Sequence, residues 1–209
     1  MSVDIVVTGS VATGKTYLQN ALRESFPDAK LYPEFIYQDS FALEILRRRF
    51  RREVSALTFQ NFILDKWDLL AQKERGDGIA IYERLPDDAV EVFSKMSLTP
   101  EEYTLHEKWL SRIPILSYKD MHADDTVWIV YENRFDKPIA PLISLVKEYM
   151  HTRKHIVIEV QSSTSYDNYK HRNRKGEDYT PEELEILYNK YLEYTALKRD
   201  IIGCQVINM

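Results

Sequence analysis

The order of apolar and polar positions along the chain predicts strands and helices that alternate. Residues 3–8 form an apolar run that ends at a glycine, which predicts a buried strand. In residues 14–26 apolar side chains instead recur at helical spacing until Pro27 ends the pattern. A second helical region covers residues 40–73, in which the arginine run at 47–52 marks a candidate break. Further strands are expected at residues 30–32, 79–82, 126–131, 155–160 and 203–207, and a helix at 141–150.

Two more helices begin with one shared signature. Thr99 and Thr180 are each N-cap candidates, followed by a proline at the first helical position and a glutamate at the third. Strands that alternate with helices favour parallel pairing. We therefore predict an α/β fold, a three-layer sandwich in which a parallel β-sheet is flanked by helices on both faces.

Length and composition narrow the class of protein. The 209 residues, 44% hydrophobic and 29% charged, predict one globular domain over residues 1–209. No apolar run approaches the ~18 residues of a membrane span, and the start lacks a signal-peptide layout, so no membrane partner is expected. Cys204 is the single cysteine, which excludes an internal disulfide and favours a reducing compartment, so we expect a cytoplasmic protein. The net charge of −5 argues against a stable nucleic-acid partner.

The first candidate for chemistry is a phosphate-binding loop. Residues 9–16 match G-x-x-x-x-G-K-[ST] at every fixed position, between a predicted strand and a predicted helix. Backbone N–H groups and the helix N-terminus would hold the phosphates of ATP. Lys15 would reach the β- and γ-phosphates, and the Thr16 hydroxyl would ligate Mg²⁺. The predicted nucleotide-binding residues are Gly9, Ser10, Val11, Ala12, Thr13, Gly14, Lys15 and Thr16.

Charged residues follow the second and third predicted strands, at the edge where α/β sheets place ligands. Glu83 could hold the metal through water, and Arg84 could stabilise the moving phosphoryl group or fix another carboxylate. Glu34 could take the proton from an acceptor hydroxyl. The structural alternative for Glu83 and Arg84 is a surface ion pair. The structural alternative for Glu34 is a solvated side chain.

A run of cations at residues 170–177 lies just before the helix that Thr180 caps. Such a run is usually a solvated face. Next to a triphosphate site, however, it predicts a mobile lid over about residues 168–178. Arg172 and Arg174 would close over the phosphates, exclude water and stabilise the charge of the transition state.

Taken together, these motifs resemble the deoxynucleoside kinase family, including the herpesviral-type thymidine kinases. The likeness covers roughly residues 3–207 and rests on the order and approximate spacing of five features. These are the phosphate loop, Pro33-Glu34, Phe59-Gln60, Glu83-Arg84 and the lid from Arg172 to Glu177. The resemblance implies the P-loop kinase fold and transfer of the γ-phosphoryl group of ATP to a deoxynucleoside 5′-hydroxyl. It also implies a possible homodimer, because family members are often dimers.

The resemblance also implies roles for single residues around the reacting groups. Glu34 would be the base that activates the 5′-hydroxyl. Glu83 and Arg84 match the acidic-Arg motif beside that hydroxyl and the metal. Arg172 and Arg174 match the arginines of the lid.

Other matched residues would bind the nucleoside. Gln60 would pair with the Watson–Crick edge of the base through its amide, and Phe59 and Phe93 look like aromatic walls of the base slot. Glu177 looks like the residue that reaches the sugar 3′-hydroxyl. Ala89 is small, as in pyrimidine-accepting members, which favours thymidine or another pyrimidine. The alternatives to nucleoside binding are that Phe59 and Phe93 pack in the core and that Gln60 is an exposed helix glutamine.

Several departures from the family pattern leave the substrate open. Leu85, Asn168 and Asp39 replace a serine, an arginine and a tryptophan that are common or expected there, and residues 126–153 look like an addition. A thymidylate-type nucleoside monophosphate kinase and a nucleotide-dependent regulatory P-loop protein remain alternatives.

The arginine run 47–52 fits a solvated helix end, a nuclear signal or a local anion site. Four histidines show no metal-ligand spacing and are interpreted as structural or surface residues: His106, His122, His151 and His155.

Overall fold

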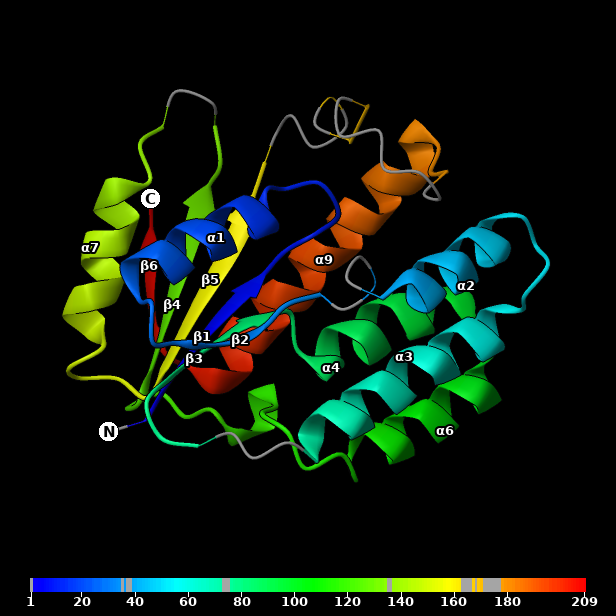
Figure 1. The fold of residues 1–209 in the computed structure, drawn as a ribbon, viewed down its shortest axis with the longest axis horizontal. Helices are drawn as coiled ribbons and strands as arrows, with labels where there is room; N and C mark the ends of the chain where they lie inside the picture. The colour runs from blue at the N-terminus through cyan, green and yellow to red at the C-terminus, as the bar shows by residue number, and fades with distance from the viewer. Residues whose placement is uncertain are drawn as a thin grey trace.

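The fold is built on a parallel six-stranded sheet (Figure 1). The computed structural model describes residues 2–34, 36, 39–72, 76–134, 137–162, 167, 169–170 and 178–209. Within this part of the chain the strand order is β2-β3-β1-β5-β4-β6, and every neighbouring pair is parallel. The strands are β1 (Val3–Thr8), β2 (Lys30–Tyr32), β3 (Ile79–Glu83), β4 (Thr126–Glu132), β5 (His155–Gln161) and β6 (Gln205–Asn208).

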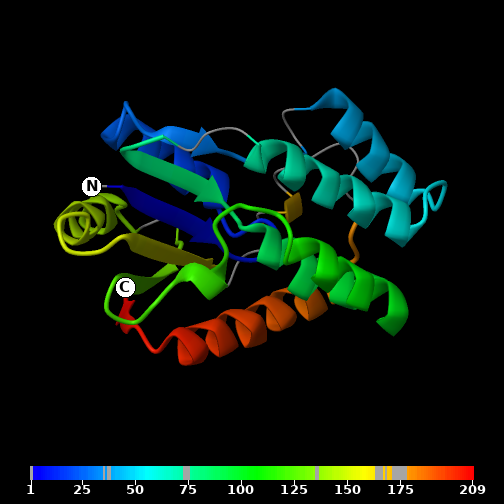
Figure 2. The same cartoon turned by 90° about the horizontal axis from the view of Figure 1, so that it is seen from below.

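Helices cover both faces of this sheet, which confirms the predicted three-layer sandwich (Figures 1 and 2). One face carries α1 (Lys15–Ser25) and α7 (Ala140–Tyr149). The other carries α9 (Pro181–Ile202), with a group of helices beside it. That group comprises α2 (Ser40–Phe50), α3 (Ala56–Ala71), α4 (Pro86–Asp88), the π-helix η2 (Ala89–Ser94), α5 (Lys95–Ser97) and α6 (Pro100–Leu110). A short 3₁₀ helix, η3 (Tyr118–Asp120), precedes β4.

The alternation of side chains along each strand explains the two core layers. In β1, Val3, Ile5 and Val7 pack with the residues of α1 and α7, whereas Val6 packs on the opposite face with those of α9. This is the period of two that a strand imposes. All six strands carry their carboxyl ends to one edge of the sheet, and β1 and β3 therefore present their last residues side by side, with Val7 opposite Glu83.

Local sequence signals account for most helix boundaries. Thr99 and Thr180 accept hydrogen bonds from the backbone N–H groups of Glu102 and Glu183, and both form the expected capping boxes. The predicted break in the long helical region is confirmed, because α2 ends at Phe50 and α3 begins at Ala56.

Asp39 has a structural role where the family pattern has a tryptophan. It caps α2 by accepting from the backbone N–H groups of Phe41 and Ala42, and it pairs with Lys66 of α3 at 2.5 Å. The Lys66 hydrogen bond and the two backbone donors lower the pKa of this carboxyl. Asp39 therefore joins α2 to α3.

Residues 86–97, for which no element was expected, form α4, η2 and α5, and the last strand also differs from its predicted bounds. The last strand begins at Gln205, because α9 continues to Ile202 and Gly203 ends it in the left-handed conformation with φ 65°. The segment that looked like an addition forms β4 and α7, and β4 lies between β5 and β6. No helix in the described ranges is long and apolar enough to cross a membrane.

Candidate active site

The loop between β1 and α1 has the backbone conformation that phosphate binding requires. Gly9 and Gly14 have φ angles of 140° and 97°. A Cβ atom on Gly9 would lie 2.4 Å from the Val160 carbonyl oxygen, and one on Gly14 would lie 2.2 Å from the Asn133 side-chain nitrogen. The Asn133 amide also donates to the Thr13 carbonyl at 2.9 Å. The dihedral angle favours glycine at both positions, and close packing against backbone adds to this at Gly9.

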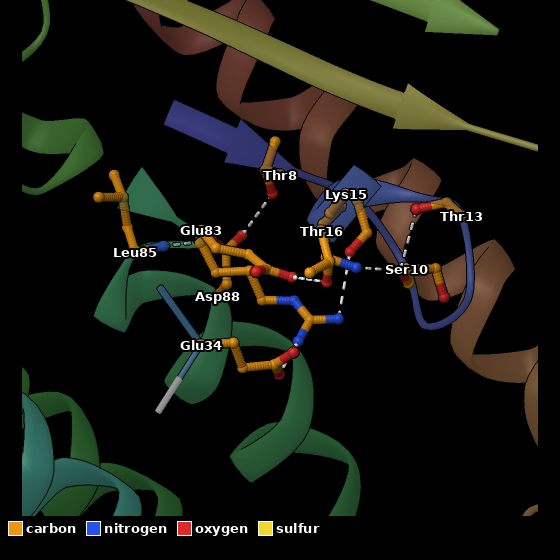
Figure 3. A network of polar contacts seen from close by, with 11 residues as sticks. Thr8, Ser10, Thr13, Lys15, Thr16, Glu34, Glu83, Leu85 and Asp88 are labelled. Carbon is orange, nitrogen blue, oxygen red and sulfur yellow. Dashed lines mark hydrogen bonds and ion pairs between the residues drawn. The ribbon is translucent and has the colours of Figure 1, made fainter. Parts of the chain in front are cut away.

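Side chains at the start of α1 connect this loop to the end of β3 (Figure 3). The Lys15 ammonium donates to the Ser10 carbonyl at 2.5 Å, within the loop. The Thr16 hydroxyl donates to the Glu83 carboxylate at 3.1 Å. Because Glu83 is the last residue of β3 and β3 adjoins β1, the sheet itself brings the carboxylate beside the helix N-terminus.

Arg84 follows immediately in the left-handed conformation, with φ 67°. Its buried guanidinium forms an ion pair with Glu34 and donates to the Gly9 carbonyl at 3.3 Å. The guanidinium carbon lies 5.2 Å from the centre of the Phe93 ring and 5.7 Å from that of Tyr191. Arg84 thus joins the ends of β2 and β3 to the phosphate loop. A non-glycine residue in this conformation costs about 1–3 kcal/mol, which is typical of functional sites.

Asp88 holds the turn that contains Arg84. Its fully buried carboxylate accepts from the Leu85 backbone N–H at 2.7 Å and from the Thr8 hydroxyl at 3.1 Å (Figure 3). The backbone N–H of Arg84 donates to the Val7 carbonyl at 2.9 Å. These bonds fix the turn to the end of β1 and direct Arg84 toward the loop.

Buried charges perturb one another in this site. Burial raises the pKa of Glu83, and the nearby Glu34 raises it further, while Lys15 and Arg84 act in the opposite direction. Burial alone would lower the pKa of Arg84, but the surrounding acidic groups, Glu34 first among the carboxylates, raise it overall. Arg84 is therefore a permanent cation between two carboxylates.

A pocket extends from the Arg84–Glu34 pair between the sheet edge and the helices η2 and α3. It encloses about 690 Å³ of empty space, counted to its open mouth. Its lining is mainly apolar and aromatic, apart from Gln60 and the charged residues at its inner end. Side chains on its walls include Phe59, Gln60, Trp67, Ala89, Phe93 and Tyr179.

The structure brings most of the predicted site residues together. The phosphate loop, Glu34, Glu83 and Arg84 form the polar end, and Phe59, Gln60 and Phe93 line the pocket. Gln60 is 5% exposed, so it is not an exposed helix glutamine. The predicted lid residues Arg172, Arg174 and Glu177, and Asn168, lie outside the described residues.

Other residues of the site were missed by sequence reasoning. Trp67 of α3 packs in the buried core and also lines the pocket. Asp88 could have been found from Pro86 at the first helical position and an acid at the third, a local signal of a helix start. Asn133 carries no such signal, because its contact with the phosphate loop spans 120 residues of sequence.

The residues present fit a magnesium ion. No group of three or more His, Cys, Asp or Glu in the described part of the chain is arranged as a metal cage. Mg²⁺ rarely uses one, because it keeps several waters and binds through one or two carboxylates together with substrate phosphates. The Thr16 hydroxyl and the Glu83 carboxylate, 3.1 Å apart, are oxygen donors of this kind.

A phosphate loop at the β1–α1 junction of this parallel sheet defines the P-loop kinase fold. Two solved structures of deoxyadenosine kinase from M. mycoides are similar, one with the products dCMP and a flexible dCDP bound and one with bound dCTP. They superpose on this chain with TM-scores of 0.64 and 0.61 and are each 14% identical to it in sequence. The superpositions cover 99% and 98% of this chain and 89% of each kinase chain. No protein-family model and no curated protein matches the sequence. The predicted resemblance to deoxynucleoside kinases is thus confirmed for the fold.

Proposed function

We propose that the protein transfers the γ-phosphoryl group of ATP to the 5′-hydroxyl of a deoxynucleoside, with thymidine or another pyrimidine deoxynucleoside favoured. One observation carries the proposal. The pocket joins an apolar, aromatic slot to a Glu34–Arg84 pair that adjoins the phosphate loop. A flat, largely apolar base fits the slot, and a sugar hydroxyl at its inner end would lie between the carboxylate and the bound phosphates.

The polar end supplies the groups that phosphoryl transfer needs. Lys15 and the loop N–H groups bind the β- and γ-phosphates, and Arg84 offers a second fixed cation. Glu34 accepts the proton of the attacking hydroxyl, and its ion pair with Arg84 fixes its orientation. Thr16 and Glu83 hold Mg²⁺, which neutralises charge on the phosphates when bound. In this proposal Arg172 and Arg174 are the cations of the lid.

The slot binds the nucleoside between aromatic rings. Phe59 and Phe93 act as its walls and Gln60 reads the base edge. The family resemblance alone assigns Glu177 to the sugar 3′-hydroxyl. The preference for a pyrimidine rests on the resemblance of the small Ala89, which lines the pocket, to the residue of pyrimidine-accepting family members. Because the similar kinase is named for deoxyadenosine and holds deoxycytidine nucleotides, a test must include purines as well.

The direct test is a panel of acceptors assayed with ATP and Mg²⁺. Thymidine, deoxycytidine, deoxyadenosine, deoxyguanosine and thymidylate are incubated with the protein, and the phosphorylated product and ADP are quantified. We expect equal amounts of ADP and nucleoside 5′-monophosphate. Turnover of thymidylate alone would establish the monophosphate kinase instead. ATP hydrolysis that no acceptor accelerates would favour a regulatory P-loop protein.

The variant Glu34→Gln tests the proposed base. It keeps the size of the side chain and a partner for Arg84 but cannot take a proton, so we expect kcat to fall about 10²-fold or more while nucleoside affinity is retained. Glu24→Gln, on the exposed surface of α1, is the matched control and should keep full activity. A loss below about threefold in Glu34→Gln would remove Glu34 from the mechanism.

A further inference from the structure

Behind the pocket, hydrogen bonds join Gln60, which the proposal assigns to the base, to three further polar side chains that have no role in the proposed reaction. The Gln60 amide oxygen lies 3.4 Å from the Ser94 hydroxyl. The same hydroxyl lies 3.2 Å from Nδ1 of His106, and Nε2 of His106 lies 2.8 Å from the Asn61 amide oxygen. The four residues come from α3, η2 and α6, and Gln60 alone lines the pocket.

Gln60, Ser94 and His106 are buried, and Asn61 at the far end of this hydrogen-bonded chain is half-buried. Ser94 is 1% exposed and His106 is 2% exposed. Within the described part of the protein, the Gln60 amide makes its only hydrogen bond with Ser94. Burial lowers the pKa of His106, so the ring is neutral near pH 7. A neutral imidazole has one nitrogen that donates and one that accepts.

Counting hydrogens leaves two consistent arrangements. If His106 donates through Nε2 to the Asn61 oxygen, Nδ1 must accept the Ser94 hydrogen. Ser94 then has only lone pairs for Gln60, so Gln60 turns its NH₂ group to Ser94. If the Asn61 NH₂ group donates instead, Nδ1 donates to Ser94, and the Ser94 hydrogen goes to the Gln60 oxygen. The orientation of one amide therefore fixes that of the other.

The orientation of the Gln60 amide matters because nucleobases come in two complementary classes. Cytosine and adenine present an amino donor beside a ring nitrogen acceptor. Thymine, uracil and hypoxanthine present a carbonyl acceptor beside a ring N–H donor at the same positions. A base held between Phe59 and Phe93 cannot rotate to exchange its donor and acceptor positions. An amide held in one orientation therefore pairs with one class of base and opposes the other.

We propose that Asn61, His106 and Ser94 are positioning residues that couple the orientation of the Gln60 amide to that of the Asn61 amide, so that the arrangement this chain adopts sets whether the pocket accepts amino bases or oxo bases. This inference rests on the proposed nucleoside kinase activity. It adds a specificity mechanism that lies outside the pocket wall: the side chain that touches the base is Gln60, but the selection is made by residues that the base never contacts.

The test compares pairs of nucleosides that differ mainly at this edge. The ratio of kcat/KM is measured for deoxycytidine against deoxyuridine, and for deoxyadenosine against deoxyinosine. The wild-type protein should prefer one class in both pairs by about tenfold or more, as expected for a site whose hydrogen-bonding groups oppose the wrong edge. In Ser94→Ala the amide is free to turn, and both ratios should move about tenfold toward one.

Two further variants separate positioning from folding. Ser97→Ala is the matched control, because its hydroxyl bonds to the Phe93 carbonyl and does not contact Gln60. It should leave both ratios unchanged. His106→Gln keeps a group that can bond to Asn61 but has none at the Nδ1 position, so it should relax the ratios as Ser94→Ala does.

The outcomes distinguish this inference from the proposed function. If no nucleoside is phosphorylated by the wild-type protein, the proposed function fails and the inference with it. If nucleosides are phosphorylated but both bases of each pair are used equally, or if Ser94→Ala lowers kcat/KM for both by one common factor, the positioning role alone is overturned. A merely structural contribution of Ser94 would give that common factor.

Discussion

Asp87 is a buried acid whose ionisation should destabilise the folded protein. Its side chain in α4 is 0% exposed. One carboxylate oxygen accepts from the Ser117 hydroxyl at 2.8 Å, and the other has no hydrogen-bond partner in the described part of the chain. Burial raises the pKa of Asp87 to about 6, the Ser117 bond lowers it in part, and the nearby Asp88 and Glu91 raise it.

The size and sign of the effect follow from proton linkage. The pKa rises from 3.8 to about 6, which is a shift of roughly 2 units and corresponds to about 3 kcal/mol at 1.36 kcal/mol per unit. Between these two pKa values the folded state binds more protons than the unfolded state, so the free energy of unfolding falls as the pH rises. The protonated form contributes its full stability below about pH 4, and that contribution is lost as the pH passes through about 6.

Asp87→Asn tests this reasoning because the amide is neutral at every pH and can still accept from Ser117. Urea denaturation of both proteins from pH 4.5 to pH 8 gives the difference in unfolding free energy. We expect the unfolding free energy of the variant, taken relative to that of the wild type, to rise with pH. The rise should amount to about 2–3 kcal/mol at pH 8. Asp124→Asn, at an exposed position, should give a small difference that does not depend on pH. A constant difference for Asp87→Asn, or one that grows toward low pH, would refute the argument.

Two further substitutions test the phosphate loop and the turn behind it. Lys15→Ala should abolish phosphoryl transfer while circular dichroism shows an intact fold, because no other loop side chain supplies the charge at the β- and γ-phosphates; near-normal turnover would contradict the loop assignment. Asp88→Ala leaves the Thr8 hydroxyl and the Leu85 N–H without their acceptor, and at about 1–3 kcal/mol for each buried donor it should lower the free energy of unfolding by about 2–5 kcal/mol in urea denaturation. A loss below about 1 kcal/mol would mean that the turn holds without this carboxylate.

The fold and the phosphate loop were predictable because their determinants are local in sequence. The motif at residues 9–16 specifies its own turn, and the caps at Thr99 and Thr180 act within three residues. The parallel sheet follows from the alternation of strands and helices. Its strand order does not, because the insertion of β4 between β5 and β6 depends on packing that no local pattern records.

The less predictable residues depend on contacts between distant parts of the chain. Asp87 and Asp88 are charged residues that follow Pro86 at a helix start, and no local pattern predicts that both are fully buried. His106 was interpreted as structural or surface, and its place beside Ser94 and Asn61 requires α3, η2 and α6 to be assembled first. No local sequence pattern predicts the π-helical winding of η2, which carries Phe93 and Ser94.

The two ends of the pocket are fixed by separate polar networks, and this has a consequence for function. At the phosphate end, Asp88 and the Val7 carbonyl hold Arg84 in its left-handed turn. At the base end, the Gln60 amide is held only through Ser94 within the described residues. Because the hydrogen bonds that hold Arg84 involve neither Gln60 nor Ser94, the two proposals together predict that substitution behind Gln60 changes the choice of base and leaves the geometry around Arg84 in place.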